Sequence, residues 1–161
     1  MKKRLVVITA LCLALAPAAI AQAEKEKAEA TIYLPGDVVW KDGPAALPPG
    51  VKIAVLEGDP GKEGYYAIRV KYPEGLYKIP PHTHPQTEHL TVISGEWHIG
   101  MGEKFDQSAG QTLPAGAYLS LPAGVKHFVW TTGETVIQLN GIGPGGINYL
   151  NPADDPRNAK K

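Results

Sequence analysis

The feature that most restricts the fold of this chain is the close spacing of glycine and proline from Thr31 onward. The chain has 161 residues, including 18 glycines and 15 prolines. After Thr31 one or the other recurs every few residues, and short runs rich in Val, Ile, Tyr and Trp lie between them. Such runs lack helical periodicity, and β-prone segments separated by turn residues are typical of sandwiches and barrels. We therefore predict an all-β fold.

The expected strands follow from the runs between these turn residues. The segment 58–64 is expected to join two strands as a hairpin loop, and Ser94-Gly95 to form a tight two-residue turn. No internal repeat and no second domain is evident. The predicted strands cover residues 38–40, 51–57, 65–71, 78–84, 88–93, 97–101, 112–113, 118–121, 127–131 and 136–140.

One predicted strand ends in a pair of histidines suited to metal binding. His82 and His84 lie two residues apart, so both rings leave the same face of an extended strand. Glu88 follows four residues later, and His127 begins a later strand after a Pro/Gly turn. Imidazole nitrogens with a carboxylate are ligands for first-row transition metals. We interpret His82, His84, Glu88 and His127 as one metal site; the alternative is surface or core histidines without an ion.

The spacing of these residues resembles the two motifs of the cupin family. The first motif is matched by His82-x-His84, three residues, Glu88, six residues and Gly95, and the second by Gly116, five residues, Pro122-x-Gly124, two residues and His127. Two positions depart from the pattern. Gly75, in the place of the leading glycine, is one residue too far from the histidines, and Thr131 stands where the family often has asparagine. Both lie outside the ligand set.

The resemblance implies a single-domain cupin-type double-stranded β-helix, also called a jelly-roll barrel, with a site of three histidines and one glutamate. It implies one divalent transition metal, with Fe, Mn, Zn, Cu and Ni all open, because Ca and Mg prefer sites made only of oxygen. Cupins are commonly dimers, so a homodimer is compatible with the resemblance. The expected partner is a small-molecule substrate or ligand.

Three further side chains are candidates for catalysis. Gln138 and Asn140 share one face of the strand 136–140, opposite Ile137 and Leu139. They face the metal if the apolar side packs elsewhere; otherwise they are an ordinary pair exposed to solvent. His98, flanked by two apolar residues, is a third candidate for lining the cavity.

The start of the sequence predicts export. A basic start and an apolar run over 5–20 precede small residues, which predicts a signal peptide over 1–23 with cleavage after Ala21 or Ala23. Residues 24–30 are expected to form a charged linker, 31–150 the cupin barrel and 151–161 a polar tail. Cys12, the single cysteine, would leave with the signal peptide, so the mature chain would contain no thiol.

These observations lead to one functional expectation and one alternative. The chain is expected to be a periplasmic or secreted metal-binding cupin, an enzyme acting on a small organic molecule, with dioxygenase-type chemistry favoured. The alternative is a cupin module that binds a small molecule or metal without turnover. No basic patch suggests nucleic acid, and no membrane contact is expected after signal cleavage. Export unfolded would mean metal loading outside the cytosol, which favours Zn or Cu.

Overall fold

The computed structural model describes residues 29–159. The predicted signal peptide, residues 24–28 of the predicted linker and the last two residues lie outside this range. The described chain from Tyr33 onward belongs to one compact unit, built from strands and short 3-10 turns, and residues 29–159 contain no α-helix. Accordingly, none of the described helical segments has the length and apolarity needed to span a membrane.

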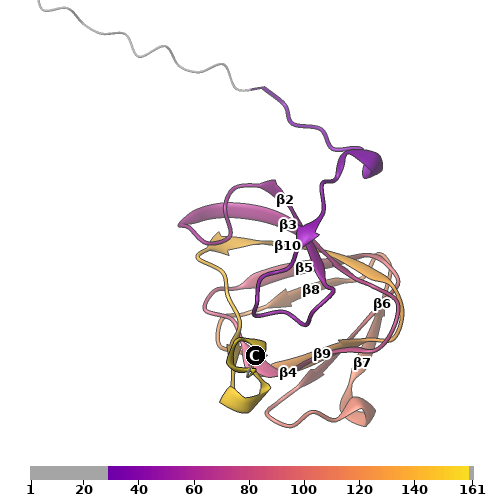
Figure 1. Ribbon diagram of the computed structural model, residues 1–161, viewed down its shortest axis with the longest axis vertical. Coiled ribbons are helices and arrows are strands. Elements are labelled where there is room, and N and C mark those ends of the chain that lie inside the picture. Colours follow the sequence, from indigo (N-terminus) through magenta and orange to yellow (C-terminus); the bar gives the residue numbers. More distant parts are fainter. Residues whose placement is uncertain (1–28, 160–161) are drawn as a thin grey trace, which may run out of the picture. The chain divides into compact units, whose positions relative to one another are not determined.

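The strands form two antiparallel sheets (Figure 1). The six-stranded sheet has the order β1-β2-β3-β10-β5-β8, and the five-stranded sheet has the order β11-β4-β9-β6-β7. From β3 to β11 the chain passes repeatedly from one sheet to the other, with only β6 and β7 consecutive in the same sheet, which confirms the predicted jelly roll. The bounds are β1 Lys41–Asp42, β2 Lys52–Glu57, β3 Gly64–Tyr72, β4 Tyr77–Thr83, β5 Glu88–Ser94, β6 Glu96–Met101, β7 Gln111–Pro114, β8 Tyr118–Leu121, β9 His127–Thr131, β10 Thr135–Gly143 and β11 Asn148–Tyr149.

The core lies between the two sheets because alternate residues of each strand point inward. In β3 the inward residues are Tyr66, Ile68, Val70 and Tyr72, all buried. Apolar side chains from both sheets, and Val51 just before β2, complete this layer; those from the strands include Ile79, Leu90, Val92, Trp97, Ile99, Val129 and Ile137.

Strand β9 is buried on both faces. Phe128 and Trp130 point away from the core, yet both are buried because Phe105, from the segment between β6 and β7, packs against them. Gly100 of β6 lies so close to the Phe128 ring that an added Cβ would overlap it. The packing of Phe105 on Phe128 and Trp130 therefore stabilises the strand that carries His127.

The structure differs from the sequence prediction at the first and last strands of the barrel domain. The predicted strand 38–40 is wrong: the first pairing falls at β1, and Val39 is exposed. Instead, the Lys71 ammonium lies over the Trp40 ring, with its Nζ 4.9 Å from the ring centroid. At the other end, the two-residue strand β11 was not predicted. The tail after it forms two 3-10 turns, η3 Pro152–Asp154 and η4 Pro156–Asn158.

Candidate metal centre

The pairing of β4 with β9 brings three histidines together. His82 lies directly opposite His127 in the register of these strands, and His84 follows just beyond the end of β4. Their candidate ligand nitrogens all lie within 4.8 Å of one another, and all three side chains are buried. Residues far apart in the sequence thus form one cluster of nitrogen donors.

Each ring is held with the same nitrogen turned toward the backbone. The Nδ1 of His82 lies 2.7 Å from the Pro80 carbonyl, and the Nδ1 of His127 lies 3.1 Å from the Val125 carbonyl. The Nδ1 of His84 lies 2.7 Å from the Gly146 carbonyl. A carbonyl oxygen can only accept, so each Nδ1 donates its proton and each Nε2 keeps a free lone pair. Metal-binding histidines require this tautomer.

Burial keeps two of these rings, His82 and His127, neutral. Desolvation, and then the neighbouring His127, lowers the pKa of His82 to about 3. Desolvation also lowers the pKa of His127 to about 4, partly offset by its bond to the Val125 carbonyl. Neutral imidazole is the form that binds a metal ion. The three rings therefore fit a transition metal in tautomer and spacing, and His82 and His127 fit it in charge as well.

Glu88 lies at the edge of this cluster. Its Oε1 is 3.4 Å from the Nδ1 of His84, and its side chain is only 14% exposed. Burial raises the pKa of this carboxyl, opposed by the neighbouring His84. However, Glu88 is outside the set of ligand atoms that lie within 4.8 Å of one another, which contains only the three histidines. Its role as the fourth ligand stays a prediction.

A cavity of about 310 Å³ extends from the histidines between the two sheets. His84, Glu88 and His127 line it, and the rest of its wall is largely apolar, with Ile68, Val70, Leu90, Ile99, Val129 and Leu139 among the lining residues. This volume is near the lower end of the range for small-molecule sites. The arrangement suits a small ligand with an apolar skeleton.

The structure does not bring Gln138 and Asn140 to the histidines, which corrects their candidate catalytic role. Ile137 and Leu139 line the cavity, so the polar pair faces the other side of β10. There Gln138 accepts a hydrogen bond from Arg69 Nε at 3.3 Å, and the Asn140 amide bonds the Tyr65 hydroxyl at 2.6 Å. The physical reason is that the cavity itself is apolar, so the apolar face of the strand forms its wall.

His98 is also placed outside the cavity. Its neighbours Trp97 and Ile99 point inward and line the wall, so its own ring points outward. The ring stacks on Trp130 at 5.0 Å, and its Nδ1 lies 2.9 Å from Thr112 Oγ1. The candidate cavity role of His98 is therefore corrected as well.

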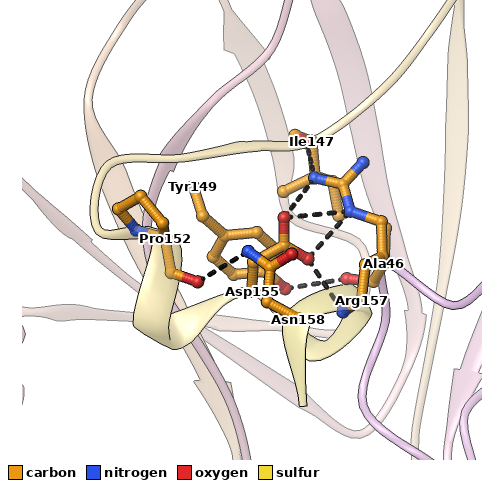
Figure 2. A network of polar contacts seen from close by, with 7 residues as sticks. All are labelled: Ala46, Ile147, Tyr149, Pro152, Asp155, Arg157 and Asn158. Carbon is orange, nitrogen blue, oxygen red and sulfur yellow. Dashed lines mark hydrogen bonds and ion pairs between the residues drawn. The ribbon is translucent and has the colours of Figure 1, made fainter. Parts of the chain in front are cut away.

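The sequence prediction missed one residue of the cavity, Arg157. It comes from η4, in the segment predicted only as a polar tail, and it forms an ion pair with Asp155 (Figure 2). Nearby, the Tyr149 hydroxyl donates to the Ala46 carbonyl at 2.8 Å, which ties β11 to the loop before β2. A single arginine in a polar tail carries no sequence signal that would assign it to a cavity.

Comparison with known proteins places this geometry in context. Residues 68–139, which include all four predicted ligands, match the family model described as Cupin domain. The rhicadhesin receptor of Pisum sativum is 32% identical over 91 residues, or 53% of this chain. This chain spans only 41% of the length of that curated relative.

Two solved structures show the same fold over most of the chain. The polyketide cyclase RemF from Streptomyces resistomycificus superposes with a TM-score of 0.64 at 16% identity, covering 80% of this chain and 90% of its own. An acetylacetone dioxygenase candidate from Methylibium petroleiphilum PM1 superposes with a TM-score of 0.59 at 19% identity, covering 82% and 88%. At these identities the likeness concerns the fold alone.

Proposed function

From the premise that this chain belongs to the cupin superfamily, we propose that it is a metal-dependent enzyme acting on a small, largely apolar organic molecule, with dioxygenase-type chemistry. The observation that carries the proposal is the convergence of three imidazoles, each with a free Nε2, two of which, His84 and His127, line an apolar cavity. A bound transition metal would supply Lewis acidity and open positions for a substrate oxygen and dioxygen.

The residues of the chain would bind and orient the substrate around this centre. The apolar walls exclude water and contact the carbon skeleton, so a polar group of the substrate is directed toward the histidines. Glu88 is the side chain best placed to hold a proton there, because its carboxyl lines the cavity and burial raises its pKa. In this proposal Glu88 Oε1 either joins the histidines as a ligand or receives a proton from the substrate.

The substrate class follows from the cavity and from the relatives. The cavity volume of about 310 Å³ suits a small molecule. One structural relative carries the name of acetylacetone, a small diketone, so diketones are the first compounds to test. The expected export would place the enzyme in the periplasm or outside the cell and would favour Zn or Cu during loading.

One observation favours the alternative, a module that binds without turnover. The three candidates for proton transfer, Gln138, Asn140 and His98, all face away from the cavity. Among the residues described here, Glu88 is then the single carboxylate that lines it. A site with so few polar groups can hold an ion or an apolar ligand without reacting.

The decisive experiment loads the protein separately with Fe, Mn, Co, Ni, Cu and Zn and measures dioxygen uptake with diketones, phenols and carboxylates. We expect stoichiometric metal and uptake with at least one compound. His127→Ala should lose both. His98→Ala is the matched control, because it removes a histidine from the neighbouring strand of the same sheet whose ring lies outside the cavity.

The outcomes separate the two functions. Full metal occupancy in the His127→Ala variant would refute the site itself. Stoichiometric metal in the wild type without uptake on any compound, together with unchanged substrate after long incubation, would support the binding module instead.

A further inference from the structure

The three histidines obtain their orientation from different sources. His82 and His127 each bond a carbonyl two residues earlier in the chain, at Pro80 and Val125. These contacts are local and form with the strands themselves. His84 instead bonds the carbonyl of Gly146, 62 residues later in the sequence. The nearest acceptor of its ring therefore belongs to another part of the chain, and Glu88 Oε1 is a more distant neighbour of the same nitrogen at 3.4 Å.

The segment around Gly146 lies just before β11, whose pairing with β4 begins at Asn148. Gly145 and Gly146 lack side chains, so their backbone has more freedom than that of other residues. Two hydrogen bonds flank the Gly146 carbonyl: the Gly145 amide donates to the Pro60 carbonyl at 2.8 Å, and the Ile147 carbonyl accepts from Arg157 Nη2 at 3.1 Å. The position of the Gly146 carbonyl thus depends on these neighbours.

Arg157 is itself held in a fixed geometry (Figure 2). Its Nε lies 2.8 Å from Asp155 Oδ1, and its Nη2 lies 2.7 Å from Asp155 Oδ2. The same carboxylate accepts the backbone amide of Arg157 at 2.9 Å and so caps η4. A planar guanidinium held at two nitrogens by a carboxylate still has a proton on Nη2 to donate to Ile147.

We propose that Arg157, fixed by Asp155, is a positioning residue for His84. It holds the Ile147 carbonyl and with it the adjoining Gly146 peptide. The Gly146 carbonyl then accepts a hydrogen bond from the Nδ1–H of His84, which keeps the Nε2 lone pair available to the ion. The C-terminal tail is in this way part of the metal site. The inference rests on the metal site of the proposed function but not on turnover.

The expected effect is selective. The Arg157 side chain is 46% exposed, the Asp155 side chain is 12% exposed, and both lie in the C-terminal tail outside the core cluster, so loss of Arg157 should leave the barrel intact. Partners that orient a metal-binding histidine change metal affinity by roughly 10–100-fold. Arg157 acts one peptide further away, so we expect about a tenfold loss of affinity, at the low end of that range.

The test uses the full chain with Arg157→Ala, Arg157→Lys and a control, Lys52→Ala. Lys52 also forms an exposed ion pair, with Asp42, outside the cavity. Affinity for Co²⁺ is measured at neutral pH by competition with a chelator. In metal-free protein, long-range proton–nitrogen NMR spectra report the tautomer of each imidazole.

Arg157→Ala should bind Co²⁺ about tenfold more weakly, and the His84 ring should leave its pure Nδ1–H form while His82 and His127 keep theirs. Arg157→Lys should not restore the affinity, because lysine keeps the charge but lacks the planar fork. Lys52→Ala should match the wild type. A His84 tautomer that is unchanged in Arg157→Ala would overturn the inference, as would full rescue by lysine or an equal change at all three rings.

These readouts are separable from the proposed function. The tautomer and the Co²⁺ affinity can both be measured if no compound is turned over. Conversely, loss of Co²⁺ binding in His127→Ala together with unchanged affinity in Arg157→Ala would support the metal site and reject the role of Arg157.

Discussion

Acidification should destabilise the metal-free protein through its buried histidines. In the unfolded chain a histidine takes up a proton as the pH falls through about 6.5. In the folded chain burial lowers the pKa of His82 to about 3 and that of His127 to about 4. Below pH 6.5 the unfolded state therefore binds more protons than the folded state, so the free energy of unfolding must fall as the pH falls.

The magnitude follows from the number of protons taken up. Each ring that is protonated only in the unfolded state reduces the free energy of unfolding by about 1.4 kcal/mol per pH unit. Integrated for His82 and His127, the loss between about pH 7 and pH 5 is about 4 kcal/mol, because the unfolded rings are not fully protonated until below pH 6. The raised pKa of Glu88 acts in the opposite direction and offsets part of this loss.

The assay is urea unfolding of metal-free protein at several pH values and constant ionic strength, followed by tryptophan fluorescence. His127→Asn should remove about half of the pH dependence. His89→Asn is the matched control, because it changes an exposed histidine outside the cluster. A loss below about 1 kcal/mol in the wild type, or equal pH dependence in all three proteins, would mean that the clustered rings protonate freely and would refute our account of the site.

Three further predictions concern single residues. Gly100→Ala should reduce the free energy of unfolding by about 1–3 kcal/mol, because the new methyl group would overlap the Phe128 ring; urea unfolding measures this, and an unchanged midpoint would contradict it. Gln138→Ala should keep metal content and any turnover within about twofold of wild type, since ordinary surface changes are nearly neutral; a large loss would return Gln138 to the site. Glu88→Gln should weaken metal binding by about tenfold if the carboxylate is a ligand or supports one, and unchanged affinity in a chelator competition would exclude Glu88 from the ligand set.

The histidine cluster was predictable because two short sequence patterns indicate it. Two-residue spacing fixed the relative directions of His82 and His84, and the turn before His127 fixed the start of its strand. Strand β10 was harder. Because side chains alternate between the two faces of a strand, Gln138 and Ile137 must point in opposite directions. This alternation does not tell which of the two faces the interior. That choice depends on the polarity of the cavity, which is a property of both sheets together.

Contacts between distant segments account for the remaining errors. The apolar run 38–40 looked like a strand, yet pairing begins only at β1, since strand formation requires a partner at the right register. Arg157 and Asp155 lie two residues apart in a polar tail, a pattern that is common on any surface. Their connection to His84 passes through backbone carbonyls of a loop. Every residue has such a carbonyl, so the sequence does not indicate which one accepts a hydrogen bond.

The dependence of His84 on Gly146 has a consequence for the order in which the site matures. A growing or refolding chain can orient His82 and His127 as soon as β4 and β9 pair. The third ring gains its partner only after β10 and the residues beyond it are in place. Until then the chain offers two prepared donors instead of three. We therefore expect tight metal capture to follow completion of the C-terminal tail, so that an unfinished chain holds an ion only weakly.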